Sequence, residues 1–172
     1  MFILLADWSK EPSSDDADEI ASMIAAHKHY FAYVEDNRAR FPQKAYELAA
    51  SAWRHDFSDH RALHDSWVES FRFLDSSLPN SGGGRVNDLE LVLLGAYHDG
   101  RIRIRYSNVH SAQLFLSGAR DGPIEIYRDE IRLSEIGLVL HEIEFMARNN
   151  WIIECDDIEQ QWEPFSDVSA EG

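Results

Sequence analysis

Histidine and aspartate, two residue types that often bind metal ions or transfer protons, crowd into DFSDHRALHDSW, residues 56–67. In a helix, His60 and His64 would lie four residues apart on one face, the spacing at which two imidazoles can share an ion. Asp59 and Asp65 would supply oxygen ligands, and the site would be that of a small metal-dependent hydrolase. The rest of the sequence offers no further ligands at a fixed spacing, so the metal site is the alternative interpretation.

The same stretch is also typical of a chain entering a β-sheet. Ser58 or Asp59 could cap a short turn, and His64 and Asp65 could fix the backbone just before a strand that begins at Trp67. From this tryptophan onwards the pattern changes to period two, as expected of a strand. The sequence favours this structural interpretation, and we expect no cofactor.

Other catalytic motifs are missing or incomplete. HEIEF, residues 141–145, has Phe145 where a zinc-protease helix needs its second histidine, and the alternation around it indicates a strand. The sequence contains no nucleophile elbow, no phosphate-binding glycine motif and no dinucleotide fingerprint. A non-enzymatic protein is therefore the favoured interpretation.

Acidic residues accumulate towards the C-terminal end. The chain has 16 Lys and Arg against 31 Asp and Glu, a formal net charge of −15, and residues 129–172 carry 12 of the acids and 2 of the bases. Such a field repels phosphate groups and anionic lipid and attracts basic surfaces. We expect no nucleic-acid or membrane binding and a basic protein as partner; the simpler alternative is that the charge only maintains solubility.

The candidate binding residues lie in the last strands. Glu142 and Glu144 should face the same side of one strand, and the next strand carries further acids. Aromatic residues, namely Trp151, Trp162 and Phe165, could anchor a partner. The predicted partner-binding set is Glu142, Glu144, Trp151, Glu154, Asp156, Asp157 and Trp162. An ordinary solvated sheet face is the alternative interpretation.

LHDSWVESFRF, followed by NDLELVLLGA and IRIRYSNV, resembles several small bacterial β-rich families. In those families a His-Asp doublet opens the first strand, and an aromatic-polar-polar-Val step ends a later one. Some of them are similar to immunity proteins found beside secreted toxins. The resemblance covers residues 63–155 and implies no catalytic residues; it implies an immunity-type inhibitor whose basic partner is a toxin.

Sequence periodicity predicts an α+β protein with its helices first. Apolar side chains spaced by three and four from Ile20 to Val34 form the core face of a first helix, with Ile24 on that face. Pro42 breaks the run, and a second helix with a stripe of small residues follows over 43–53. The two helices are expected to pack closely as an antiparallel hairpin.

The remainder of the chain predicts an antiparallel sheet of about six strands joined by short turns. Strand-like alternation begins near residue 66, and Asp-Gly at 99–100 predicts a two-residue hairpin turn. We expect a single domain, with a helical part at 1–57, a β part at 63–157 and an acidic tail at 158–172.

Three further expectations concern the single cysteine, the cellular compartment and a possible homodimer. Cys155 cannot form an internal disulfide and should be a core residue. The apolar start MFILLADW is too short and meets charge too early for a signal peptide or a membrane span, so we expect a cytoplasmic protein. The arginines of RIRIRY, residues 101–106, could pair with acidic strands of the same chain or of a second copy in a homodimer.

Overall fold

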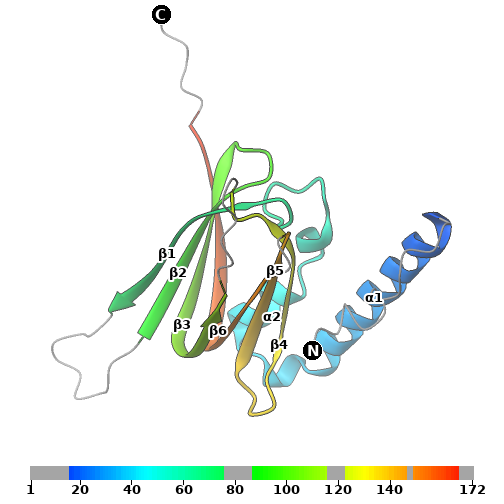
Figure 1. Cartoon of the computed structure of the whole chain (residues 1–172). Coiled ribbons are helices and arrows are strands. Elements are labelled where there is room, and N and C mark those ends of the chain that lie inside the picture. Colours follow the sequence, from blue (N-terminus) through cyan, green and yellow to red (C-terminus); the bar gives the residue numbers. More distant parts are fainter. Residues whose placement is uncertain (1–15, 76–86, 116–122, 147–148, 167–172) are drawn as a thin grey trace, which may run out of the picture.

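The computed structural model describes residues 16–75, 87–115, 123–146 and 149–166, and it has an α+β architecture with the helices first (Figure 1). The helices are α1 (Asp16–Asp36) and α2 (Gln43–Ala49), each followed by a short 3₁₀ turn, η1 (Arg38–Arg40) and η2 (Ala52–His55). The strands are β1 (Trp67–Asp75), β2 (Asn87–Leu94), β3 (Gly100–Leu114), β4 (Ile126–Leu133), β5 (Val139–Phe145) and β6 (Asn150–Pro164). No helix among the described residues is long and apolar enough to cross a membrane.

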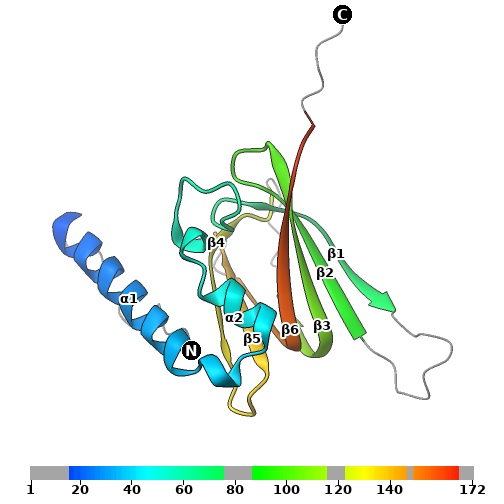
Figure 2. The same cartoon turned by 180° about the vertical axis from the view of Figure 1, so that it is seen from behind.

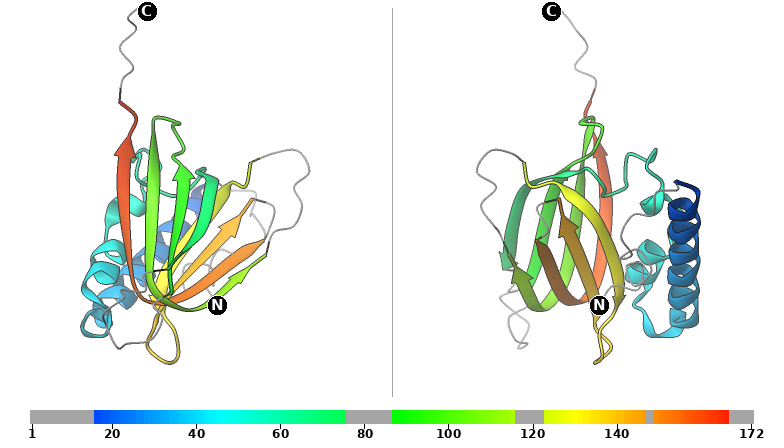
Figure 3. Two further views of the ribbon diagram at one scale, coloured as in Figure 1. Left: turned by 90° about the vertical axis from the view of Figure 1, so that its left-hand side faces the viewer. Right: turned by 45° about the vertical axis from the view of Figure 1, so that its right-hand side comes forward.

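The six strands form one antiparallel sheet in the order β1-β2-β3-β6-β5-β4. The sheet is strongly curved, and its two edge strands meet at one end (Figure 3). There the Val68 amide donates to the Ile124 carbonyl and the Ile126 amide donates to the Ser66 carbonyl, both at 2.9 Å. The sheet is therefore a partly closed barrel.

Alternating side chains fill this barrel. On β2, Leu89, Leu91 and Leu93 are fully buried on the inner face, and Glu90 on the outer face is also largely covered, so the strand is buried on both faces. Phe71 of β1 reaches across to Trp151 of β6, with ring centroids 5.2 Å apart. Burial of each such leucine stabilises the fold by about 1.5–3 kcal/mol, which makes this interior the main source of stability.

The helical segment, residues 16–55, covers the side of the barrel where β4 and β5 do not reach the second half of β6. β5 pairs with β6 only as far as Cys155, so among the described strands the rest of β6 pairs with β3 alone. α2 lies along that free stretch, where the Ala45 amide donates to the Asp157 carboxylate at 2.9 Å and Lys44 pairs with Glu159 at 2.5 Å. The helix thus covers the side of β6 on which β5 no longer pairs with it.

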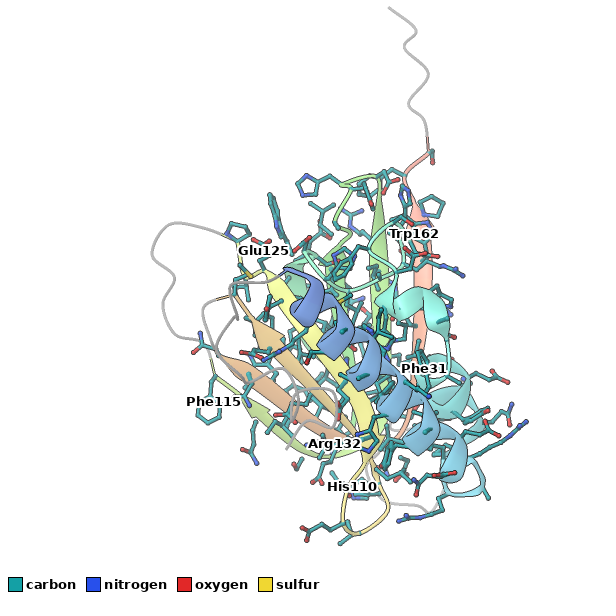
Figure 4. All side chains as sticks on the ribbon, turned by 90° about the vertical axis from the view of Figure 1, so that its right-hand side faces the viewer. Phe31, His110, Phe115, Glu125, Arg132 and Trp162 are labelled. Atoms are coloured by element: carbon teal, nitrogen blue, oxygen red, sulfur yellow. The ribbon has the colours of Figure 1, made fainter. Side chains whose placement is uncertain are left out.

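The other border of the opening is the edge of β4, which α1 crosses (Figure 4). The Tyr30 hydroxyl donates to the Ile131 carbonyl, and the Leu133 amide donates to the Tyr33 hydroxyl, both at 2.9 Å. Backbone groups at a sheet edge need such partners when they are buried. Two tyrosines therefore satisfy an edge that no strand covers among the described residues.

The helices bury only part of the faces that the sequence predicted, and their partners differ. Tyr30 and Val34 of α1 are buried, whereas Ile24, predicted for the core face, is 60% exposed. The small residues of α2, including Ala45 and Ala49, pack on β6 and β4, while α1 lies farther from the sheet (Figure 2). The predicted stripe of α2 is buried, but it packs on the sheet, because the helices must meet two sheet edges, which the pattern of one helix does not reveal.

Two predicted boundaries are wrong. β6 continues to Pro164, which still pairs with Gly100 of β3. The acidic tail therefore does not begin at residue 158. The β2–β3 connection spans residues 95–99 with His98 at a φ of 56°, in place of a two-residue Asp-Gly turn. The end of the tail, 167–172, and the apolar start of the chain lie outside the described residues.

Candidate functional site

A row of polar side chains crosses the barrel interior. The Tyr106 hydroxyl on β3 lies 2.8 Å from Nδ1 of His141 on β5, whose Nε2 lies 3.0 Å from Oδ2 of Asp129 on β4. The guanidinium group of Arg54, from η2, pairs with the same carboxylate oxygen. A carboxylate, an imidazole and a hydroxyl in this order are also the groups of nucleophilic active sites.

The protonation states of this row follow from its partners. An ionised carboxylate only accepts hydrogen bonds, so Nε2 of His141 donates to Asp129, and Nδ1 accepts from the Tyr106 hydroxyl. Burial, together with the nearby Arg54, holds the pKa of His141 well below its usual value. Burial also raises the pKa of Tyr106 well above its usual value. The imidazole is therefore neutral and the phenol keeps its proton at neutral pH.

This polar row is sealed inside the protein. Tyr106 and His141 are 0% exposed, and Asp129 is 8% exposed. Cys155 is also buried, as predicted, and burial raises the pKa of its thiol to about 12, which makes it a poor nucleophile. Within the described part of the structure, the three side chains of the row are therefore enclosed by the barrel.

The predicted acidic face of β5 and β6 exists, but arginines neutralise much of it. Glu142 and Glu144 do lie on one face of β5, beside β6. Arg132 pairs with Glu142 at 2.7 Å, and Arg128 pairs with Glu144 at 2.6 Å. These two carboxylates are therefore engaged within the chain, and Glu142 is in addition buried.

Two other members of the predicted binding set hold the fold. Trp151 is buried against Phe145, and its Nε1 donates to the Phe115 carbonyl at 3.3 Å, so it is a core residue and no exposed anchor. Asp157 accepts from the Ala45 amide at the start of α2, which has no side-chain cap of its own. Sequence reasoning missed this role because the capped helix is more than a hundred residues away.

Two further acids of the set lie on β6. Asp156 is exposed, and it accepts hydrogen bonds from Asn108 and pairs with His110, both at 2.7 Å. Glu154 is half-buried, opposite Leu140 of β5. Neither of these two residues is part of the core, so both stay compatible with a binding surface.

The arginines of β3 pair with carboxylates of the same chain. Arg101 binds Glu69 of β1 at 2.6 Å, and Arg105 binds Asp88 of β2 at 2.6 Å. Arg103 lies 3.0 Å from both Glu90 and Glu163, which belong to the strands on either side. Burial alone would raise the pKa of Glu90, but hydrogen bonds from Arg72 and Arg103 outweigh it and lower that pKa. Each of these three arginines therefore has a carboxylate partner within its own chain.

The four residues of the alternative metal site do not converge. Residues 58–65 form turns and no helix, and Nδ1 of His60 lies 2.6 Å from Asp99 while His64 contacts its neighbour Asp65 at 3.2 Å. Asp59 is bound by Arg61, whose hydrogen bonds lower its pKa to about 2. Within the described part of the chain, no group of three or more His, Cys, Asp or Glu side chains could hold a metal ion.

One of these four residues, His60, belongs instead to an exposed cluster at the closed end of the barrel. Figure 1 shows the β2–β3 turn, the end of β6 and the segment after η2 at the same end of the molecule. We call Phe57, His60, Tyr97, Asp99 and Phe165 the barrel-end cluster. The Tyr97 hydroxyl donates to the Phe57 carbonyl at 2.9 Å, His60 stacks on Tyr97 with centroids 4.3 Å apart, and the Phe165 amide donates to the Asp99 carbonyl at 2.7 Å.

Trp162, the remaining member of the predicted binding set, packs between this cluster and the ends of the β2–β3 turn. Its indole ring lies against Gly95 and Gly100, where an added Cβ would overlap the ring, and its centroid is 6.2 Å from that of His60. The close approach explains why both ends of the β2–β3 turn are glycine. Of the predicted anchors, Trp162 is thus beside the exposed cluster and Trp151 is not.

Sequence reasoning pointed to three of the five residues of the barrel-end cluster. The dense stretch 56–67 pointed to Phe57 and His60, and Phe165 was expected as an aromatic anchor. Tyr97 was missed, and Asp99 was predicted only as part of a hairpin turn, because no motif links that turn to the stretch 56–67. Comparison with known proteins adds nothing to the assignment: no family model, curated protein or solved structure matches the chain.

Proposed function

We propose that this chain is a non-enzymatic acidic binding protein, an immunity-type inhibitor whose partner is a basic protein such as a bacterial toxin. The observation that carries the proposal is a contrast in burial. The groups with the chemistry of an active site, Asp129, His141 and Tyr106, are enclosed in the barrel. The side chains that proteins use to bind one another, aromatic rings, are exposed at the barrel end.

The charge of the chain supports a basic partner. The net charge is −15, and on the outer face of β1, β2 and β3 carboxylates and arginines pair with one another. The excess of acid therefore acts elsewhere on the molecule. Long-range attraction of this kind accelerates the encounter with a basic protein and discourages nucleic acid and anionic lipid.

The test is capture followed by reconstitution. The full chain is immobilised, exposed at low salt to extract from the cells that contain it, and the captured proteins are identified by mass spectrometry. We expect a basic protein whose purified form binds with a dissociation constant that rises steeply with salt concentration. Only acidic or neutral captured proteins, or binding that salt does not weaken, would contradict the proposal.

Elemental analysis distinguishes this function from the metal-dependent hydrolase. Protein prepared without an affinity tag and dialysed against chelator should contain far less than one metal ion per chain. A stoichiometric ion that His60→Ala or His64→Ala removes would favour the hydrolase instead. Reversing Glu142 or Asp157, in contrast, is not informative, because both residues hold the fold together.

A further inference from the structure

The barrel-end cluster has the composition of a protein-binding surface. Phe57, Tyr97 and Phe165 are 57%, 50% and 41% exposed, yet their positions are fixed by the contacts of the cluster. Large aromatic side chains that are ordered before binding lose little conformational entropy when a partner covers them. Exposed rings gathered in this way are a common sign of an interaction site.

The charge around these rings is negative. The three segments that meet at the barrel end, residues 56–66, 95–101 and 162–165, contain five carboxylates and two guanidinium groups. One of those guanidinium groups belongs to Arg61, which already binds Asp59 at 2.7 Å. Asp99 has a histidine, His60, as its partner at 2.6 Å in place of an arginine or lysine.

The same region already binds guanidinium groups of its own chain on aromatic rings. Arg101 lies over the ring of Phe165 at 4.9 Å, and Arg61 lies over the ring of Trp53 at 4.5 Å. A cation on an aromatic face is stabilised by the ring's quadrupole, and a nearby carboxylate adds to that attraction. The ring of Tyr97 stacks on His60 and is still 50% exposed; with Asp99 two residues further on, it offers the same chemistry to a cation from outside.

We propose that the barrel end is the surface on which this protein holds its basic partner, with an arginine or lysine side chain of the partner against Tyr97 and Asp99. The inference rests on the proposed function and adds the place and the chemistry of contact. A second copy of this chain is a poor occupant, because two such acidic ends repel each other. Phosphate-bearing ligands are repelled for the same reason.

The direct test uses a capped hexa-arginine peptide as the probe and hexaglutamate as its charge control. The peptide is titrated into the ¹⁵N-labelled full chain, and backbone amide shifts are followed by NMR. We expect saturable shifts centred on residues 57–60, 97–99 and 165, and none with hexaglutamate. Shifts centred on the β5–β6 face, or equal shifts with both peptides, would overturn the inference.

Variants make the test specific. Tyr97→Ala should weaken peptide binding about tenfold and Asp99→Asn about fivefold, since an anchor ring and its neighbouring charge are lost. Glu35→Gln is the control for Asp99, because it neutralises another exposed carboxylate, the partner of Arg38 near the end of α1. Phe73→Ala, which removes an aromatic side chain that is 65% exposed on β1, is the control for Tyr97. Both controls should bind within about twofold of the unaltered chain.

The outcomes separate this inference from the proposed function. If a basic protein is captured but binds Tyr97→Ala and Asp99→Asn as tightly as the unaltered chain, the function stands and the barrel end is the wrong surface. If neither a basic protein nor the arginine peptide binds, both proposals fall. Shifts that depend on protein concentration without peptide, and that Tyr97→Ala abolishes, would show a second copy as occupant and overturn the inference.

Discussion

Arg54 carries its charge into the interior, where it meets Asp129 beneath the helical segment. A buried ion pair adds little net stability, because the cost of removing both charges from water offsets their attraction. Removing one partner is nevertheless strongly destabilising, because the other charge stays buried without a counter-ion. The residue therefore links the helices to the barrel: its own segment is η2, and its partner is on β4. The same carboxylate orients His141, so one arginine supports the whole polar row.

Replacing Arg54 by methionine should accordingly lower the free energy of unfolding by about 3–5 kcal/mol, because Asp129 is left buried without its cation. Urea unfolding followed by circular dichroism measures this. Adding Asp129→Asn to Arg54→Met should recover part of the loss, since a neutral amide can still accept from His141. Arg61→Met, which breaks an exposed pair with Asp59, is the control and should cost at most about 1 kcal/mol. Equal effects of the two arginine variants would refute the role of Arg54.

At the scale of elements, α2 depends on β6 for its N-terminal cap. It begins after Pro42 without a capping side chain, and at seven residues it has little stability of its own. Asp157 supplies the missing acceptor at 2.9 Å from the Ala45 amide. Helix and strand are therefore fixed in one register along the opening of the barrel.

Asp157→Ala should destabilise the protein by about 1 kcal/mol, as expected for the loss of a helix cap. Amide exchange should accelerate in the first turn of α2 more than in β4 or β5. The neighbouring Asp156→Ala is the matched control, because that exposed carboxylate caps no helix, and its effect should stay within about 0.5 kcal/mol. Faster exchange throughout the sheet in both variants would show that the cap is not what holds α2.

For the whole molecule, buried neutral histidines make stability depend on pH. Burial lowers the pKa of His141 well below its usual value, and burial, Arg54 and His27 lower that of His55 to about 3. In the unfolded chain both would titrate near pH 6.5. As the pH falls, the unfolded state therefore binds protons before the folded state does. The contribution of these histidines to the free energy of unfolding is complete above about pH 6.5 and is lost as the pH falls below it.

We expect the free energy of unfolding to fall by about 1.4 kcal/mol per pH unit for each of these histidines between pH 6.5 and 4.5. Urea titrations at several pH values measure the slope. His55→Phe should reduce it by the share of one histidine, because a phenylalanine ring suits the aromatic contacts with Tyr30 and Phe31. His29→Gln, at an exposed position of α1, should leave the slope unchanged. A stability that is constant over this range would contradict the prediction.

The sequence by itself determined the α+β class, the antiparallel sheet and the core position of Cys155. The reason is that the period of apolar residues along a strand or helix is local, and that pattern indicates which residues will be buried. It did not determine that Glu142, Trp151 and Asp157 serve the fold, because their partners depend on strand order and on a helix distant in sequence. His60 and His64 lie four apart in the chain, yet only the tertiary structure decided that they face different neighbours. The barrel end likewise arises where three separate segments meet, and a meeting of that kind is set by how the sheet curves and closes.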